Sequence, residues 1–166
     1  MRIIIQRVKE ASVKTGGEYV SQIGRGALIL LGITHGDTLK QAEQMSAKML
    51  KLRLWHDEET EKTWSKSILD LDYEVIVVSQ FTLYGILKGN KPDFHGAMPG
   101  DAARTIYEHF VANMRKLHKP ERIGTGAFGQ KMEVALINDG PVTMTYETEP
   151  PPPKKTAAPK EAKKEI

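Results

Sequence analysis

Two short stretches hold the residues whose types and spacing could do chemistry, and each follows a strand-forming run. Ser79-Gln80-Phe81-Thr82 comes after the apolar run Glu74–Val78, which predicts a buried strand that ends in polar groups. Asn138-Asp139-Gly140-Pro141 comes after the alternating run Met132–Ile137, and strand-forming residues resume directly behind it. Because Pro cannot donate to a strand ladder and Gly weakens one, we expect a sharp backbone change at Gly140-Pro141.

The Gly140-Pro141 dipeptide has two interpretations. It is a plain turn, since Gly and Pro are the strongest markers of turns, or it is a rigid element that presents its backbone carbonyls to a ligand. A cis peptide bond, which proteins fix mainly before proline, would point the two carbonyls in nearly the same direction. The residues alone leave both interpretations open.

No side chain is arranged as an obvious nucleophile or metal ligand. The chain has no cysteine and five scattered histidines, and it lacks both the Gly-x-Ser-x-Gly and the His-Glu-x-x-His spacing. Thr82 is the candidate side-chain nucleophile, but a threonine hydroxyl needs an adjacent base, and the neighbouring residues offer none. We therefore predict a site with no metal and no cofactor, with Thr82 as a covalent nucleophile kept as an alternative.

Composition bounds the class of protein. The 166 residues suit one domain, no apolar run approaches the roughly 20 residues that span a bilayer, and no secretory signal precedes the first strand. The absence of cysteine suits a reducing compartment, so we expect a cytoplasmic protein without membrane contact.

Charge is unevenly distributed along the chain. Residues 1–149 carry 19 basic and 19 acidic side chains, and the remaining five lysines and two glutamates lie in residues 150–166. A neutral body argues against a broad footprint for duplex nucleic acid. We predict a domain over residues 1–149 and a disordered, Pro/Lys-rich extension over residues 150–166.

The elements that must position the two stretches are strands and two helices that do not alternate regularly. Thr38 and Gln41 have capping-box spacing ahead of a helical apolar pattern, and Asp101 is expected to cap a second helix that ends at Pro120. The expected strands are residues 3–13, 19–23, 27–33, 75–81, 132–137 and 142–148. We predict a single α+β domain, a mostly antiparallel β-sheet or partial barrel with two main helices packed on it.

The two stretches together resemble the signature motifs of the D-aminoacyl-tRNA deacylase family. The resemblance runs from Met1 to Thr143 and includes residues 6–8, 24–26, 88–95 and 126–129. Lys91-Pro92-Asp93-Phe94-His95 is similar to eukaryotic members. Members commonly read Gly-x-Phe-Gly-Ala-x-Met, whereas this chain has Gln130-Lys131-Met132, a departure at the pocket edge that bears on substrate preference.

The resemblance implies a homodimeric enzyme that hydrolyses the ester of D-aminoacyl-tRNA, and also of glycyl-tRNA. It implies catalysis by backbone amides of one segment with help from the tRNA 2′-hydroxyl: Ser79, Gln80, Phe81 and Thr82. It implies a set that binds substrate and rejects L-aminoacyl esters: Gly140, Pro141, Arg7, Val142, Thr143 and Phe128. In the family the Gly-Pro element reaches across the dimer interface into the active site of the partner subunit, and Arg7 resembles the arginine that holds this element from across the interface. A rigid obstacle suits this task, because binding contacts alone discriminate poorly between small apolar groups.

Two rival functions remain open from the sequence. The protein could be a nucleic-acid-binding module that acts through its basic tail, since basic segments attract phosphate. It could also be a general esterase with the same fold. The role of Arg7 also has two interpretations, because a charged residue within an apolar strand is as often a surface residue as a functional one.

Overall fold

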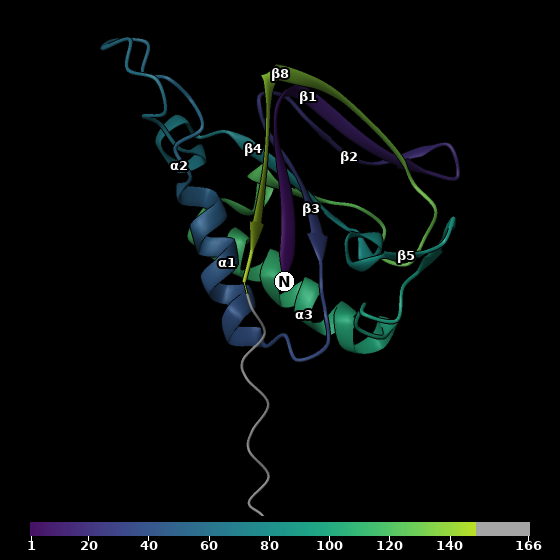
Figure 1. Cartoon of the computed structure of the whole chain (residues 1–166). Coiled ribbons are helices and arrows are strands. Elements are labelled where there is room, and N and C mark those ends of the chain that lie inside the picture. Colours follow the sequence, from purple (N-terminus) through teal and green to yellow (C-terminus); the bar gives the residue numbers. More distant parts are fainter. Residues whose placement is uncertain (149–166) are drawn as a thin grey trace, which may run out of the picture.

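The structure is a computed structural model that describes residues 1–148 (Figure 1). The sequence-predicted extension over residues 150–166 lies outside the described residues. Antiparallel pairing predominates in the main sheet, as the sequence predicts, and the sheet curves into a partial barrel against two main helices. The α+β fold class is therefore confirmed.

Strand β1 (Arg2–Thr15) is the centre of the sheet. Along one edge it pairs antiparallel with β3 (Gly26–Gly32) and then with β2 (Glu18–Ile23), and along the other edge with β8 (Glu133–Glu147). Strands β4 (Glu74–Ser79) and β7 (Ile123–Thr125) extend the sheet in parallel from β3. These two parallel ladders are not predicted from the sequence.

A side-chain bridge nearly closes the barrel. The Ser21 hydroxyl on β2 donates to the Thr125 carbonyl at 2.6 Å and accepts from the Thr125 amide at 2.9 Å. Strand β7, at the end of the sheet, is thereby tied back to β2, which pairs with β1. The bridge takes the place of a ladder between the two strands and limits the exposed sheet edge.

Two cores lie on opposite faces of the sheet. Val75 and Val77 pack toward helices α1 (Leu39–Lys51) and α3 (Gly100–Leu117), whereas Ile76 and Val78 belong to a second cluster with Val8. Both faces of β4 are therefore covered, which explains why its sequence is a continuous apolar run rather than an alternating one. A short helix, α2 (Ile68–Leu71), precedes β4.

The helix starts show one confirmed and one wrong prediction. The capping box at α1 is present, with the Gln41 amide donating to the Thr38 hydroxyl and the Thr38 amide to the Gln41 side chain. Helix α3 instead begins at Gly100 with Pro99 as its N-cap, so Asp101 is not the cap. Asp101 lies in the first turn, where a negative charge favours the helix dipole. The helix ends at Leu117, and Pro120 begins the 3-10 helix η2 (Pro120–Arg122).

The two strands predicted for residues 132–137 and 142–148 form one strand, β8. Asn138 pairs with Val8 and Thr143 with Gln6, so four residues of β8, 139–142, face only Arg7 of β1. The ladder bulges here, and Pro141 stands where no ladder hydrogen bond is required of it. The Gly140-Pro141 peptide bond is cis, and Gly140 has a φ of 125°.

Candidate active site

A cavity opens at the carboxyl end of β4, where the chain leaves the sheet. Its volume is about 380 Å³. It is lined by Leu31, Ile33, Ser79, Gln80, Phe81, Phe94, Ala97, Met98, Pro99, Gly100, Ala103, Phe128 and Gly129. Mostly apolar walls with a few convergent polar groups are typical of a small-molecule site.

Backbone geometry turns the first motif away from the sheet. The predicted strand 75–81 stops at Ser79, the Gln80 amide donates to the Leu31 carbonyl at 2.8 Å, and the 3-10 helix η1 (Phe81–Tyr84) begins. The first amides of such a helix have no acceptor within it. The amides of Phe81 and Thr82 have no hydrogen-bond partner among residues 1–148. Phe81 lines the cavity and Thr82 is the next residue, so one backbone donor is available at the wall and a second directly beside it.

Thr82 is not arranged as an activated nucleophile. Its hydroxyl accepts from the side-chain amide of Gln80, which is no base. The cavity is lined by Ser79, Gln80 and Phe81 but not by Thr82. The side chain of Thr82 thus orients Gln80, while its backbone amide is one of the two available donors.

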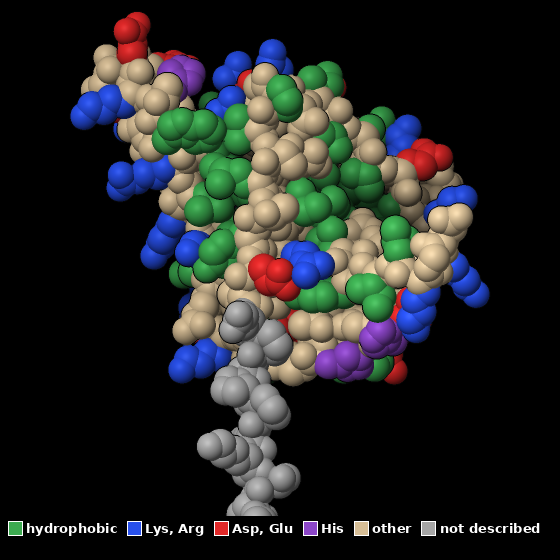
Figure 2. Space-filling model, viewed as in Figure 1, with side chains coloured by type: hydrophobic (Ala, Val, Ile, Leu, Met, Phe, Trp, Pro, Cys, Tyr) green, Lys and Arg blue, Asp and Glu red, His purple; other side chains and the backbone are tan. Residues whose placement is uncertain are grey.

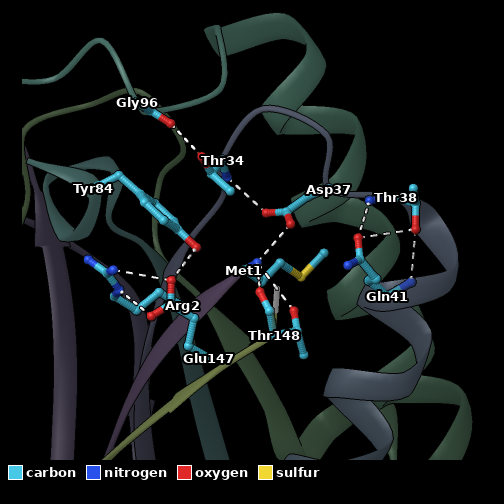
Figure 3. A network of polar contacts seen from close by, with 10 residues as sticks. All are labelled: Met1, Arg2, Thr34, Asp37, Thr38, Gln41, Tyr84, Gly96, Glu147 and Thr148. Carbon is cyan, nitrogen blue, oxygen red and sulfur yellow. Dashed lines mark hydrogen bonds and ion pairs between the residues drawn. The ribbon is translucent and has the colours of Figure 1, made fainter. Parts of the chain in front are cut away.

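The Arg2 side chain on β1 holds η1 in place through the Leu83 carbonyl. This role was not predicted from the sequence. Its guanidinium donates to the Leu83 carbonyl at 2.5 Å and to both oxygens of Glu147 at 3.1 Å, and it lies 4.7 Å from the centre of the Tyr84 ring. The Tyr84 hydroxyl also reaches Glu147 (Figure 3). Burial raises the pKa of Tyr84, so the phenol stays neutral. The one sequence signal for these contacts is the charged Arg2 at the start of an otherwise apolar strand.

A buried ion pair anchors the loop that carries Phe94 to Met98. The Met1 ammonium contacts Asp37 at 2.7 Å, and both groups are fully buried. Asp37 accepts from the Thr34 amide at 2.8 Å, and the Thr34 hydroxyl donates to the Gly96 carbonyl at 2.6 Å (Figure 3). The loop that supplies Phe94, Ala97 and Met98 to the cavity is therefore anchored to the start of β1.

Aromatic rings frame the cavity. Phe81 is 57% exposed and meets Phe94 edge-to-face, with ring centres 5.1 Å apart. Phe128 lies 5.4 Å from the buried Tyr107 ring. The Tyr107 hydroxyl donates to the Val77 carbonyl at 2.7 Å, and burial raises its pKa to about 12. Exposed aromatic faces beside a cavity suit stacking of unpaired bases.

A small hairpin directly precedes Phe94 in the chain. It consists of β5 (Ile86–Lys88) and β6 (Lys91–Asp93). Lys88 pairs with Asp93 at 3.0 Å, and the ring of His95 contacts the same carboxylate. The hydrogen bond from His95 holds the pKa of Asp93 well below its usual range, with a further contribution from Lys88.

The second motif, Asn138 to Pro141, lies in strand β8 and not at the cavity. Arg7 donates to the Asp139 carbonyl at 3.0 Å and to the Leu54 carbonyl at 2.6 Å, which fixes the bulge of β8. Val142 lines a separate hollow of about 240 Å³ with Arg7, Leu54, His56, Thr63 and Trp64. Thr143 pairs with Gln6 in the ladder. Arg7 therefore has a structural role, because its side chain joins β8 to the Leu54 carbonyl.

One chain does not bring the two motifs together. Arg7 is level with Ala27 and Val75, whereas Ser79 is level with Leu31. The motifs are separated by four residues along the strands, roughly 13 Å, and by the strands β1 and β3 across the sheet. The cavity unites Ser79, Gln80, Phe81 and Phe128 but excludes Gly140 and Pro141.

Two negative findings concern residues 1–148. No group of three or more His, Asp or Glu side chains in this part of the chain is placed to hold a metal ion. No helix in the same described range is long and apolar enough to cross a membrane.

The fold is shared with solved structures. One, described as "c-Myc DNA Unwinding Element Binding Protein", superposes with a TM-score of 0.85 at 51% identity over 90% of this chain and 99% of that chain. Another, described as a probable eukaryotic D-amino acid tRNA deacylase, has a TM-score of 0.77 at 16% identity over 87% of this chain and 97% of that chain, which shows the fold alone. The fold and cavity thus define the class, a single-domain α+β protein of this deacylase fold.

Sequence comparison gives the family. A family model described as "D-Tyr-tRNA(Tyr) deacylase" matches residues 4–147. D-aminoacyl-tRNA deacylase 1 of Homo sapiens is 50% identical over 164 residues, covering 99% of this chain and 78% of that protein. The D-aminoacyl-tRNA deacylase of Dictyostelium discoideum is 47% identical over 148 residues, covering 89% of this chain and 98% of that protein. The chain belongs to the D-Tyr-tRNA(Tyr) deacylase family.

Proposed function

We propose that the protein hydrolyses the ester of D-aminoacyl-tRNA, and also of glycyl-tRNA, to free tRNA and amino acid. The observation that carries this proposal is the cavity lined by Ser79, Gln80 and Phe81. Within residues 1–148 the amides of Phe81 and Thr82 have no hydrogen-bond partner, and the Thr82 hydroxyl contacts the Gln80 amide rather than a base. Such a site suits a substrate that is already activated. An aminoacyl ester is activated, and membership of the family supports the same substrate class.

In the proposed reaction the ester carbonyl oxygen accepts from the amides of Phe81 and Thr82. Water attacks the carbonyl carbon, and the negative charge that develops on the oxygen is stabilised by these two donors. The bond between the carbonyl carbon and the ribose oxygen then breaks, and that oxygen takes the proton that the attacking water gives up. The neighbouring 2′-hydroxyl of the tRNA assists the proton transfer. Removing one such backbone donor typically lowers a rate by about 10²–10³-fold.

Selectivity is proposed to come from a second copy of the chain. The Gly140-Pro141 segment lies far from the cavity of its own chain, and both residues are exposed. Strand β8 also has an outer edge without a ladder partner in the described chain. Figure 2 shows hydrophobic side chains gathered on the face along β8, and the large exposed ones of this strand are Val134, Ile137 and Met144.

These features support a homodimer in which each copy inserts Gly140-Pro141 into the cavity of the other. Backbone carbonyls at that position would obstruct an L side chain and leave room for a D side chain or for glycine. Val142 and Thr143 would flank the inserted segment, and Arg7 would hold it. The cytoplasm is the proposed compartment, because a chain without cysteine suits a reducing environment.

Parallel deacylation of D-tyrosyl-, L-tyrosyl- and glycyl-tRNA by the purified protein, without added metal or nucleotide, tests the proposal. We expect rapid loss of the D-ester, measurable loss of the glycyl ester and an L-ester no less stable than in buffer. Equal cleavage of both tyrosyl esters would favour a general esterase. Binding of tRNA without any cleavage would favour a nucleic-acid-binding module.

A further inference from the structure

A second hollow lies beside the candidate active-site cavity, between α3 and β7. Phe128 lines both, so the two hollows are neighbours that share one wall. The second hollow has a volume of about 500 Å³ and is lined by Arg104, Tyr107, Glu108, Val111, Ala112, Arg115, Thr125, Gly126 and Phe128. We call the part formed by Arg104, Arg115 and Phe128 the α3 shelf.

The α3 shelf carries a local excess of positive charge. Arg104 is exposed, forms no ion pair within residues 1–148, and lies with its guanidinium 5.0 Å from the centre of the Phe128 ring. Arg115 donates through Nε and Nη2 to the Ile123 carbonyl, at 3.4 and 3.1 Å, so its guanidinium is held at the surface. Glu108 is the single acidic side chain of the lining.

The spacing of the two guanidinium groups suits a short single strand. Eleven residues separate Arg104 from Arg115, which is close to three helical turns, so both lie on one face roughly 16 Å apart. At ~3.4 Å per stacked nucleotide, this distance covers a few nucleotides. Guanidinium groups bind phosphate bidentately, and sites for single strands combine aromatic side chains with Arg.

We propose that the α3 shelf binds the single-stranded 3′ end of the tRNA, with Arg104 and Arg115 on its phosphates and Phe128 against a base. This inference rests on the proposed function, because the aminoacyl ester in the cavity fixes where the strand must emerge. The body as a whole is neutral, with 19 basic and 19 acidic residues in positions 1–149, the two shelf arginines included. A neutral body with one small basic patch suits binding of an unpaired RNA end better than binding of a duplex.

The test compares two substrates of different length on the full-length protein. D-tyrosyl-tRNA reaches the shelf, whereas D-tyrosyl-adenosine carries the same ester without any phosphate. The variants are Arg104→Gln, Arg115→Gln and the double substitution. Lys116→Gln is the matched control, because Lys116 is exposed on the same helix but lines neither hollow.

We expect the double variant to lower kcat/KM for D-tyrosyl-tRNA about tenfold more than for D-tyrosyl-adenosine, mainly through KM. The slope of log kcat/KM against log salt should become shallower by about 1.4, since each single-strand phosphate contact contributes about 0.7. Arg104→Gln alone, which leaves the Ile123 contact intact, should show part of the effect. Lys116→Gln should match the parent for both substrates.

An equal loss of kcat/KM on both substrates, or no loss on either, would contradict binding of the tRNA 3′ end by the α3 shelf. A failure of the proposed function is distinguishable, because the parent protein would then cleave neither ester. In that case the shelf is tested with a labelled, uncharged RNA hairpin ending in CCA. The parent should bind this probe about tenfold more tightly than the double variant, and equal affinities would overturn the inference.

Discussion

At the scale of single residues, Gly140 is a position that tolerates little change. Its φ is 125°, and an added Cβ would lie 3.0 Å from Arg7 Nη2 and 3.1 Å from Val142 Cγ2. Gly140→Ala should therefore cost about 1–3 kcal/mol of stability and displace the segment. We expect the ratio of D- to L-tyrosyl-tRNA deacylation rates to fall by at least about tenfold.

Gly17→Ala is the matched control for this substitution. Gly17 also has a positive φ, of 82°, but a Cβ there meets nothing within 4 Å. It lies in the turn between β1 and β2, away from both motifs. The control should lose stability and keep its D-to-L ratio. A similar change of ratio in both variants would show that the effect is not specific to the Gly-Pro segment.

In the proposed reaction, backbone amides rather than side chains stabilise the developing charge. Thr82→Val keeps the amide and removes the hydroxyl, so the rate should stay within about threefold, whereas loss of a true nucleophile costs about 10³-fold or more. Phe81→Pro and Phe81→Ala both remove the ring, but only proline removes the N–H, and proline is tolerated at the first position of a helix. Phe81→Pro should be slower than Phe81→Ala by about 10²-fold.

Single-turnover deacylation of D-tyrosyl-tRNA measures these rates. A collapse of the rate in Thr82→Val would restore the covalent mechanism. Equal rates for the two Phe81 variants would remove the backbone donor from the reaction.

At the scale of elements, η1 depends on the clamp by Arg2. Arg2→Ala removes the hydrogen bond to the Leu83 carbonyl, the pair with Glu147 and the contact with Tyr84. Because small displacements of a reacting group are costly, we expect kcat to fall about five- to tenfold while KM for the tRNA changes little. Arg2→Lys should restore part of the loss.

Lys14→Ala controls for the loss of a cation over a tyrosine ring. Lys14 lies on the same strand and stacks on Tyr19 at 4.3 Å, at the other end of β1. Steady-state kinetics of the three variants should leave Lys14→Ala equal to the parent. A rise in KM instead of a fall in kcat for Arg2→Ala would assign Arg2 to binding rather than to positioning of η1.

Elements were predictable where their signal is local. The apolar run of β4 and the capping box at Thr38 are local, and both elements form as predicted. The continuity of β8 was not predictable, because the bulge depends on the register with β1, where Arg7 alone faces four residues. Pro99 replaced Asp101 as the cap of α3 for a similar reason, since the preceding loop is tied to β3 through Met98 and Ile33.

The candidate site was predictable by residue type but not by placement. Both motifs are identifiable from sequence, yet only contacts between distant strands show that they lie apart in one chain. The ion pair of Met1 with Asp37 and the clamp by Arg2 join residues 36 and 81 or more positions apart. No local pattern carries such contacts.

At the scale of the whole molecule, the described body should suffice for activity. A chain cut before Pro150 keeps Thr148, whose backbone and hydroxyl contact the Met1 ammonium. We expect it to deacylate D-tyrosyl-tRNA at the parental rate, with at most a weaker affinity at low salt after loss of five lysines. Loss of both activity and tRNA binding in the shortened chain would favour the tail-driven binding module.

The central claim is that one active site is built from two copies of the chain. Mixed dimers test it with two variants, each damaged in one motif. Gly140→Ala alters the inserted segment. Gly100→Trp fills the cavity, and the open space around Gly100 makes the substitution tolerable for the fold. In a mixed dimer, the cavity of the Gly140→Ala copy receives the intact segment of the Gly100→Trp copy.

The measurement is D-selective deacylation by purified mixed dimers, compared with both variant homodimers and the parent. The account predicts that mixing restores about half of the parental D-selective activity, because one of the two symmetric sites is intact. Mixed dimers no more D-selective than the average of the two variant homodimers would show that each site belongs to a single chain.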